Sequence, residues 1–372
     1  SYKCHYIMKI TNKYSKSAIL MQNFLKIFRN KKVLITGATG FKGAWLSLWL
    51  QMLGAKVFAI GYSPNKNKNL FYSLNLHKKI KINILDVRNK KKLSGYISKI
   101  KPEFIFHLAA QPLILESYKE PFKTYEINTF GTLNILEISR KSKFVRSLIC
   151  VTSDKCYESN FSTRGFKESD RLGGVDPYSG SKAAAEIIIK TYIESFQKKQ
   201  NRLGIASARA GNVMGGGDQS PNRLIPDIVN SLNNKKKIVL RNPNFNRPWQ
   251  HVLDPLYGYL ILAAKLYKEP KKYSGPWNFG TEKNTVTSVL KIVKYAIKNW
   301  GQGELLVNKK KQPYEQTNLQ LNIDKSKKNL KWKPKYKIQD SVKLTIEWYK
   351  QVLNKEKTAE EITKKQINDY TK

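Results

Sequence analysis

Residues 32–54 read KVLITGATGFKGAWLSLWLQMLG, and this stretch decides the fold class. The apolar run Val33–Thr36 predicts a short buried strand, and Ala44–Leu53 predicts a helix that ends at Gly54. Between strand and helix the glycines follow the spacing G-x-x-G-x-x-G. A strand, a glycine-rich turn and a helix in this order are typical of a unit that binds a dinucleotide.

The three glycines of this turn have different expected roles. Gly37 permits a tight turn, Gly40 lets backbone N–H groups approach a pyrophosphate, and Gly43 lets the helix pack closely on the strand. The helix N-terminus adds unpaired N–H donors, which favour an anion. We therefore expect the loop, including Phe41 and Lys42, to contact a dinucleotide cofactor.

The rest of the first 210 residues repeats this rhythm of short apolar runs and amphipathic stretches. The alternation predicts a doubly wound (Rossmann) parallel α/β sheet with helices on both faces. The candidate strands are Val33–Thr36, Val57–Ile60, Ile82–Leu85, Phe104–His107, Leu148–Val151 and Ile205–Ala208. Besides Ala44–Leu53, the clearest helical patterns are Asn128–Arg140 and Tyr178–Phe196.

Changes in composition divide the chain into four parts. Residues 1–30 show no sustained periodicity and are expected to be a poorly ordered N-terminal extension, whereas residues 31–210 should form the nucleotide-binding domain. After about residue 210 glycine and proline become frequent, so residues 211–350 should form mainly a smaller substrate-binding α/β lobe. Residues 351–372 are polar and are expected to be a frayed C-terminal tail.

The composition limits the possible function classes. The chain carries 68 Lys and Arg against 27 Asp and Glu, a formal net charge of +41, and 41% of its residues are hydrophobic. That apolar content excludes disorder as the dominant state. The charge would suit nucleic acid, but only 11 of the basic residues are arginines and the lysines are spread along the chain. We expect no nucleic-acid partner, and a non-catalytic basic nucleic-acid-binding protein stays as the alternative from another class.

The cysteines and the hydropathy of the chain bear on whether it binds a metal and where in the cell it is expected. Three cysteines without a C-x-x-C pair predict neither a disulfide framework nor a thiolate metal site, so we expect no metal and a reducing, cytoplasmic location. No uncharged apolar stretch approaches the roughly 20 residues of a membrane-spanning helix. Nothing near residue 1 resembles a signal peptide, so no membrane partner is expected.

A tyrosine and a lysine stand four residues apart in the predicted helix Tyr178–Phe196. The spacing Tyr178-x-x-x-Lys182 places the phenol and the ammonium on one helix face, about one turn apart. An ordinary tyrosine, with a pKa of about 10, is a poor base at neutral pH, but a nearby cation favours its phenolate. The pair can therefore take a proton from a substrate hydroxyl. A half-exposed helix face without a catalytic role is the alternative.

A second polar cluster, Ser153–Lys155, follows the strand Leu148–Val151, at the sheet edge where such folds bind ligands. Together with Tyr178 and Lys182, this cluster resembles the catalytic set of the extended short-chain dehydrogenase/reductase family. The resemblance implies that Ser153 binds the reacting hydroxyl and that Tyr178 is the base. It implies that Lys182 tunes that base.

Longer segments sharpen the resemblance. From residue 32 to about residue 350 the chain is similar to the CDP-glucose 4,6-dehydratases, a branch of that family. The segments that carry this likeness are GATGFKGAWLSLW (37–49), HLAAQ (107–111), VTSDKCYE (151–158), DPYSGSK (176–182), RAGNVMGGGD (209–218) and RPWQHVL (247–253). Other sugar-nucleotide 4,6-dehydratases typically carry Asp-Glu where this sequence has Asp154-Lys155, so the lysine points to the CDP-glucose branch.

The resemblance implies a lyase that converts CDP-D-glucose to CDP-4-dehydro-6-deoxy-D-glucose for cell-surface polysaccharide such as lipopolysaccharide O-antigen. C4 is oxidised, water leaves across C5 and C6, and hydride returns to C6. Lys155 is then the base at C5 and Asp154 the acid at the C6 hydroxyl. Because neighbours on a strand face opposite sides, both reach one sugar only if the backbone turns after Ser153. A surface ion pair is the alternative for Asp154 and Lys155.

Further cofactor contacts are expected at the ends of other strands. The resemblance assigns Leu108, Ala109 and Ala110, after the fourth strand, to the cofactor site. Asp86, after the third strand, can contact the adenine side of a cofactor, although an aspartate that caps its own loop is an alternative. The second strand ends without the acid that selects NAD and without an arginine for a 2′-phosphate, so NAD follows from the family resemblance alone.

A substrate diphosphate requires fixed cations, and the planar fork of arginine suits it. The candidate substrate-binding residues are Arg247, Arg223, Asn212, His251 and Asn128. Each of the first four could instead hold the loops of the lobe in place, and Asn128, at the start of a helix after the fourth strand, is expected to support the site. We expect a homo-oligomer, either a dimer or a tetramer. The alternative enzymes are another nucleotide-sugar 4,6-dehydratase or a 4-epimerase, which needs the C4 ketone but no base at C5.

Overall fold

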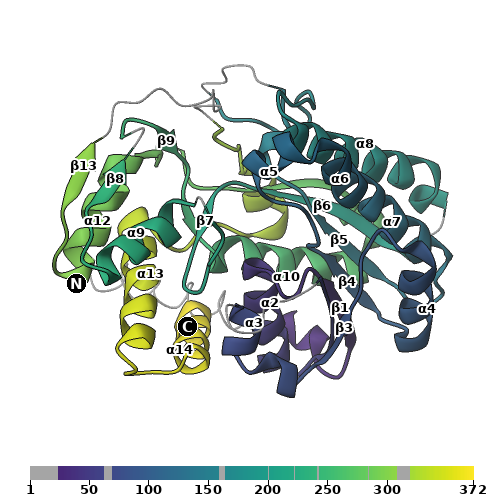
Figure 1. Cartoon of the computed structure of the whole chain (residues 1–372). Coiled ribbons are helices and arrows are strands. Elements are labelled where there is room, and N and C mark those ends of the chain that lie inside the picture. The colour runs from purple at the N-terminus through teal and green to yellow at the C-terminus, as the bar shows by residue number, and fades with distance from the viewer. Residues whose placement is uncertain are drawn as a thin grey trace, which may run out of the picture.

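The computed structural model describes residues 24–62, 69–158, 164–199, 201–221, 223–240, 243–283, 285–307 and 319–372. Its centre is a seven-stranded sheet in the order β11-β6-β5-β4-β1-β2-β3, in which every neighbouring pair is parallel (Figure 1). The strands are β1 (Lys32–Thr36), β2 (Lys56–Gly61), β3 (Lys81–Ile84), β4 (Phe104–His107), β5 (Ser147–Val151), β6 (Gly204–Ala210) and β11 (Gly275–Phe279). The predicted fold class and all six predicted strands are confirmed.

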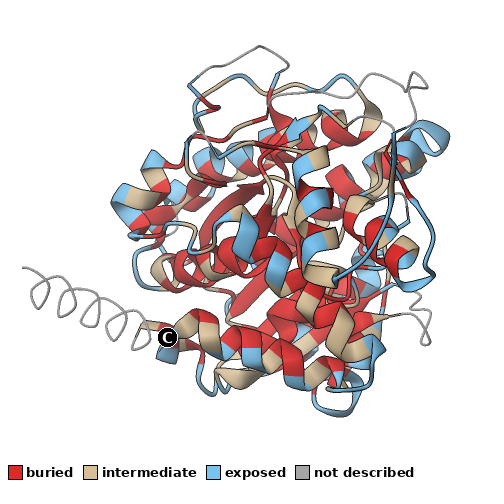
Figure 2. Cartoon of the chain, turned by 90° about the vertical axis from the view of Figure 1, so that its left-hand side faces the viewer, coloured by how far each residue is buried: buried red, intermediate tan, exposed pale blue. Residues whose placement is uncertain are grey.

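Helices cover both faces of the sheet because its strands are apolar on both sides. In β1, for example, Val33 and Ile35 join one hydrophobic core and Leu34 joins the other. Buried residues accordingly concentrate on the sheet and on the inward sides of the helices (Figure 2). The core around Leu34 is formed with α4 (Lys90–Ile100), α7 (Gly131–Lys141) and α8 (Pro177–Ser195), and the other core with α2 (Phe41–Met52) and α10 (Leu253–Lys268).

Several short helical elements connect the strands of the sheet. Two short helices and a π-helical turn, η4, lead into α7, so the predicted helix Asn128–Arg140 is confirmed with a different first turn. These elements are α3 (Leu70–Ser73), η3 (Leu76–Lys78), α5 (Ile114–Lys119), α6 (Pro121–Tyr125), η4 (Glu126–Phe130), η5 (Asp154–Cys156) and η6 (Gln197–Lys199), with the first two preceding β3.

The C-terminal part forms a smaller lobe at one side of the sheet (Figure 1). Its elements are β7 (Val213–Met214), α9 (Leu224–Asn233), β8 (Ile238–Leu240), β9 (Asn246–Arg247), β10 (Gln250–His251), β12 (Thr287–Ser288), α12 (Val289–Trp300), β13 (Leu305–Val307), η7 (Ser326–Leu330) and α13 (Ile338–Leu353). The predicted boundary at residue 210 does not separate the two parts, however. The chain returns to the main sheet through α10, α11 (Pro270–Tyr273) and β11, because β6 otherwise ends as an unpaired edge.

Both predicted chain ends need correction where the structure describes them. Residues 24–30, assigned to a poorly ordered extension, include the turn η1 (Lys26–Phe28), whose Phe28 is buried against Phe104 and Phe106. The predicted frayed tail contains helix α14 (Ala359–Thr371), which packs on α2, α3 and α13. Its polar composition hides an amphipathic pattern that buries Ile362, Ile367 and other inward residues.

The structure also bears on membrane and cysteine expectations. Within the described ranges, no helix combines the length and apolar character that crossing a membrane requires. Cys150 and Cys156 are both buried free thiols. Burial raises the pKa of each thiol well above its ordinary range, so neither is a reactive thiolate at neutral pH.

Candidate active site

The glycine turn between β1 and α2 is built so that only glycine fits at two positions. Gly37 has φ +71°, and a Cβ there would lie 2.6 Å from the backbone N of Ala109. A Cβ on Gly43 would lie 2.1 Å from the carbonyl oxygen of Gly37. Gly40 is the N-cap of α2 and brings no side chain, so the first-turn amides face an open approach. The turn therefore fits a dinucleotide phosphate, as the sequence predicted.

The loop after β4 lies against this turn and includes the predicted cofactor residues Leu108, Ala109 and Ala110, all half-buried. The Thr36 hydroxyl accepts a hydrogen bond from the Ala109 N–H at 3.3 Å and lies 2.7 Å from His107 Nδ1. β1 and β4 are adjacent at the point where the strand order reverses. Open α/β sheets bind their ligands at that switch point.

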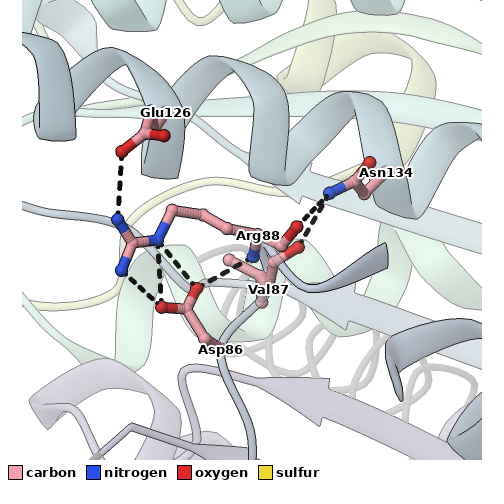
Figure 3. Close-up of polar contacts among 5 residues, drawn as sticks. All are labelled: Asp86, Val87, Arg88, Glu126 and Asn134. Carbon is pink, nitrogen blue, oxygen red and sulfur yellow. Dashed lines mark hydrogen bonds and ion pairs between the residues drawn. The ribbon is translucent and has the colours of Figure 1, made fainter. Parts of the chain in front are cut away.

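Asp86 follows β3, and its side chain is occupied by its own loop (Figure 3). Its carboxylate accepts from the Arg88 N–H at 2.9 Å and forms a two-pronged ion pair with the Arg88 guanidinium. Burial raises the pKa of Asp86, but the hydrogen bonds from Arg88 outweigh it and leave the pKa low. Arg88 also pairs with Glu126, at the start of η4. The loop-capping alternative is therefore observed, and contact with adenine stays a prediction.

The backbone after β5 turns sharply after Ser153, as the predicted roles of Asp154 and Lys155 require. Residues Asp154–Cys156 form the 3₁₀ turn η5, and Ser153 is its N-cap. The Ser153 Oγ accepts from the Lys155 N–H at 3.2 Å and lies 3.1 Å from Asp154 Oδ1. The turn thus removes the geometric objection that neighbours on a strand would point to opposite faces.

Tyr178 and Lys182 lie in the first turns of α8, next to this segment. Asp176 caps the helix through the Ser179 N–H, and Pro177 starts it, so the helix begins one residue before Tyr178. Burial raises the pKa of Tyr178 to about 12, and a hydrogen bond with Ser153 opposes the rise. Lys182 donates to the Val151 carbonyl at 3.4 Å, and burial lowers its pKa to about 8.

This electrostatic picture corrects one expectation. The sequence predicted that Lys182, together with the charge of a bound nicotinium, favours the phenolate; in the chain alone, burial of the phenol is the larger effect and the pKa of Tyr178 is raised. The hydrogen bond with Ser153 and the positive charge of Arg223 are the favourable contributions from the chain. Formation of the phenolate therefore requires further positive charge or a concerted proton transfer.

Asp154 is buried, and its surroundings favour a protonated carboxyl. Burial raises the pKa of Asp154, although the positive charges of Lys155, Arg247 and Lys42 and the hydrogen bond with Ser153 oppose the rise. A carboxyl with a raised pKa is suited to donate a proton. The alternative of an exposed surface ion pair is therefore wrong for Asp154.

Basic side chains from three elements surround this carboxyl. Arg247 is buried on β9, and Arg223, the N-cap of α9, pairs with Asp218 at 3.4 Å. The pKa of Lys42 is lowered to about 8 by burial and by the positive charge of Arg223 and Lys182. Positive charges that lower the pKa of a neighbouring lysine favour an anionic ligand, so the cluster suits a diphosphate. Asn212 lies beside it, where its carbonyl accepts from the Gln250 N–H.

Two predicted substrate residues prove to be buried within the protein. The His251 ring is fully buried between Trp45 and Tyr336, and its Nδ1 accepts from the Leu253 N–H. Burial lowers its pKa to about 3, so it is neutral. Asn128 is also buried, and its amide binds Gln111 and Ser181. Both residues therefore support the loops of the site, and a contact of either side chain with substrate stays a prediction.

Sequence reasoning gave no role to a second layer of polar residues around the catalytic segment. Thr152, Tyr157, Glu186 and Arg209 are all buried and hydrogen-bonded to one another. A signal was present, since Arg209 interrupts an apolar strand and Glu186 an apolar helix face, and charged residues are rarely buried without a partner. Tyr259, on α10, is likewise buried, and its hydroxyl has no hydrogen-bond partner among the described residues.

Comparison with known proteins agrees with this geometry. The family model of the GDP-mannose 4,6-dehydratases matches residues 34–345. A CDP-glucose 4,6-dehydratase of Salmonella typhimurium is 38% identical over 348 residues, which cover 92% of this chain and 97% of that protein. A dTDP-D-glucose 4,6-dehydratase of Dictyostelium discoideum is 30% identical over 68% of this chain and 58% of its own length.

Solved structures show the same architecture. The dTDP-glucose 4,6-dehydratase of Bacillus anthracis, in complex with NAD, superposes with a TM-score of 0.73 at 25% identity and covers 86% of this chain and 97% of its own. The UDP-glucose 4-epimerase of Thermotoga maritima, at 21% identity and a TM-score of 0.74, shares the fold over 87% of this chain and 99% of its own. The extent of these matches and the Ser153, Tyr178 and Lys182 arrangement agree, so the chain belongs to the GDP-mannose 4,6-dehydratase family, within the extended short-chain dehydrogenases/reductases.

Proposed function

We propose that the chain is a CDP-glucose 4,6-dehydratase, an NAD-dependent lyase that converts CDP-D-glucose to CDP-4-dehydro-6-deoxy-D-glucose. The observation that supports the proposal is the turn η5: Asp154 and Lys155 follow Ser153 on one turn, and Ser153 and Asp154 both act on the hydroxyl of Tyr178. The Salmonella typhimurium relative, a CDP-glucose 4,6-dehydratase, is 38% identical to this chain over nearly its full length. A 4-epimerase needs no acid and base of this kind, so the pair favours dehydration.

Three side chains of this chain handle the C4 hydroxyl. Ser153 Oγ and the Tyr178 hydroxyl are hydrogen-bonded to each other, so both can contact one substrate oxygen. Tyr178 takes the hydroxyl proton as C4 is oxidised, and Ser153 holds the oxygen. Lys182, on the next turn of α8, adds positive charge near the developing phenolate. When bound, NAD accepts hydride from C4 and returns it to C6.

Asp154 and Lys155 then carry out the loss of water. The C4 ketone acidifies the C5 hydrogen, Lys155 removes that proton, and Asp154 gives a proton to the departing C6 hydroxyl. An AspH and a neutral lysine hold the same number of protons as the ion pair, so this arrangement needs no additional proton. Burial of Asp154 favours the arrangement in which its carboxyl is protonated.

The glycine turn, its adjoining loop at residues 108–110 and the N-terminus of α2 would hold the dinucleotide. The preference for NAD over NADP is supported by the NAD complex of the Bacillus anthracis structure. Arg247 and Arg223 would bind the diphosphate of the sugar nucleotide, since they supply fixed positive charge, and Lys42 would contact the dinucleotide.

The same proposal includes a homo-oligomer formed through α5, α6, η4 and α8. These elements contact one another and leave large apolar side chains exposed. The exposed side chains are Leu115, Tyr118, Phe122, Tyr125, Phe130 and Ile187. Contiguous exposed apolar surface of this kind is typical of protein interfaces. Light scattering should give at least twice the monomer mass, and Phe122→Asp should lower it, whereas a monomeric wild type would contradict this part.

A cytoplasmic location also belongs to the proposal. Its support is the buried free thiols of Cys150 and Cys156, which suit a reducing compartment, together with a substrate class that is activated by a nucleotide. Fractionation of cells that produce the full chain, with the chain detected in the cytoplasmic fraction, would test it; detection mainly in a membrane or extracellular fraction would contradict it.

The decisive experiment offers the purified chain, with added NAD, separate CDP-, dTDP- and GDP-sugars and follows products by mass spectrometry. The expected product is lighter than CDP-glucose by one water, and it should form faster than any product from the other sugars. A product of unchanged mass but altered C4 configuration would identify an epimerase. Faster water loss from a dTDP- or GDP-sugar would move the assignment to another 4,6-dehydratase.

A further inference from the structure

The segment Thr152–Tyr157 carries the three groups Ser153, Asp154 and Lys155 between two anchored ends. At one end the Thr152 hydroxyl donates to Glu186 Oε1, and at the other the Tyr157 hydroxyl accepts from Arg209 Nη1 at 2.8 Å. Arg209 Nη2 donates to Glu186 Oε2 at 2.6 Å. These bonds close a ring through the segment, and we call Thr152, Glu186, Arg209 and Tyr157 the clamp.

The clamp is built on a buried ion pair. The Arg209 and Glu186 side chains are 3% and 2% exposed. Burial raises the pKa of Glu186, but the charge and hydrogen bonds of Arg209 and the hydroxyls of Thr152 and Ser207 lower it further, so the carboxylate stays ionised. A buried, hydrogen-bonded charge pair tolerates little displacement, because each partner loses its compensation when the other moves. The pair can therefore define the distance between the two ends of the segment.

The Tyr157 end is tied to the rest of the sheet. The Tyr157 hydroxyl donates to Asn278 Oδ1 at 2.7 Å, and the Arg209 guanidinium stacks over the Tyr157 ring at 4.9 Å. Asn278, on β11, donates to the carbonyls of Phe166 and Asn322 at 2.8 and 3.1 Å. The clamp is thus attached to two elements of the sheet and to the C-terminal part of the chain.

We propose that Glu186 and Arg209 are positioning residues for the elimination step: by holding both ends of the segment, the clamp sets where Asp154 and Lys155 stand relative to the substrate. Tyr178 and Lys182 lie on α8 itself, so their spacing is set by helical geometry rather than by the ends of the segment. Asp154 and Lys155 lie on a single 3₁₀ turn, whose orientation depends on its ends. This inference rests on the proposed function, since it concerns the step in which water leaves.

The test uses conservative changes at the two ends of the segment. Thr152→Val and Tyr157→Phe each remove one hydroxyl and leave the ion pair in place. The matched control is Ser207→Ala, because the Ser207 hydroxyl donates to the same Glu186 carboxylate at 2.8 Å but lies on β6, outside the segment. Thr152→Ser keeps the donor and serves as the rescue variant.

We expect Thr152→Val and Tyr157→Phe to slow water loss from CDP-glucose about tenfold or more, because small displacements of catalytic groups are costly. C4 oxidation should slow less than elimination, because its base Tyr178 lies on α8 and only Ser153 belongs to the segment. Reduced nicotinamide should therefore accumulate with substrate, which shows that elimination has become slower than oxidation. Ser207→Ala and Thr152→Ser should behave like wild type. Equal effects of Thr152→Val and Ser207→Ala, or equal slowing of oxidation and elimination, would overturn the proposal.

A measurement without substrate keeps this inference separate from the proposed function. Hydrogen exchange of the amides in residues 152–158 should accelerate in Thr152→Val and Tyr157→Phe and stay unchanged in Ser207→Ala. If wild type leaves CDP-glucose intact while this exchange pattern holds, the proposed function fails and the clamp stands. If exchange is unchanged in all variants, the clamp fails whatever the substrate.

Discussion

The turn Ser153–Cys156 and the layer of polar residues next to it each bury a carboxylate, and the two carboxylates have opposite electrostatics. The pKa of Asp154 is raised by burial despite positive charges around it, whereas the pKa of Glu186 is lowered, because Arg209 outweighs its burial. Glu186 forms a hydrogen-bonded ion pair with the Arg209 guanidinium, whereas the positive side chains around Asp154 act on its pKa through their charge. The comparison shows that burial alone does not decide the pKa of a carboxyl group: it rises at Asp154 and falls at Glu186, where the bonded guanidinium of Arg209 outweighs burial.

The largest effect is expected at Tyr178, the proposed base of the oxidation step, which is hydrogen-bonded with Ser153 of the same turn. Tyr178→Phe should lower turnover roughly 10²- to 10⁴-fold, the usual contribution of a positioned acid or base. Reduced nicotinamide should not appear when substrate is added, and absorbance in a stopped-flow instrument would show this. Tyr62→Phe, at an exposed position, is the control. Unchanged reduction of the cofactor in Tyr178→Phe would remove Tyr178 from the mechanism.

Lys155→Met separates the two halves of the reaction. Water loss should fall by about 10²-fold or more, since the C5 proton has no base, while C4 oxidation continues and reduced cofactor accumulates. Quenched-flow analysis of the sugar products would measure both steps. The exposed Lys190→Met on α8 is the matched control. Wild-type rates of dehydration in Lys155→Met would show that another group removes the proton.

The structural acid can be tested through its partner. Arg209→Met should lower the free energy of unfolding by about 3–5 kcal/mol, because it leaves Glu186 buried and uncompensated. Urea unfolding at neutral pH would measure the loss. Arg164→Met breaks the surface pair with Asp170, in which the arginine is 54% exposed, and should cost under about 1 kcal/mol. Similar losses in the two variants would mean that the pair at Glu186 has no special structural weight.

A third buried carboxylate sharpens the comparison through pH. Burial raises the pKa of Asp254 to about 7, although hydrogen bonds from the Lys335 N–H and the Tyr370 hydroxyl oppose the rise. Since the folded pKa lies above the unfolded value of 3.8, the folded state binds the extra proton, and the stability from this group is lost as pH rises from about 4 to about 7.

Asp254→Asn should therefore remove this contribution. As the pH rises from about 4 to about 7, the unfolding free energy of the variant should increase relative to that of wild type by up to about 4 kcal/mol. Urea unfolding at several pH values would measure the difference. A difference that stays constant from pH 4 to pH 7 would show that Asp254 titrates normally in the folded protein.

Local sequence patterns predicted the parts of the fold that depend on local physics. Alternating apolar runs predicted the strands, and the spacing of Gly37, Gly40 and Gly43 predicted the turn, because a side chain at Gly37 or Gly43 would clash with the backbone. The pair Tyr178 and Lys182 shares a helix, so its proximity follows from helical geometry alone. The polar segment after β5 was found because catalytic groups gather at strand ends.

Contacts between distant segments were out of reach of those patterns. His251 and Asn128 were predicted as substrate residues because their types suit binding, but burial among Trp45 and Tyr336, or between Gln111 and Ser181, is decided by which helices pack together. The packing of α14 and the return of β11 to the sheet were missed for the same reason.

The sequence by itself therefore determined six strands of the sheet and the glycine turn, since each depends on neighbours within a few residues. The family resemblance pointed to the candidate catalytic groups. Only the tertiary structure decided the protonation of those groups and what holds them. The pKa of Asp154 depends on burial and on Arg247, almost a hundred positions away, and the clamp joins Thr152 to Arg209 through Glu186. Burial and electrostatics are set by the folded surroundings, which no local pattern contains.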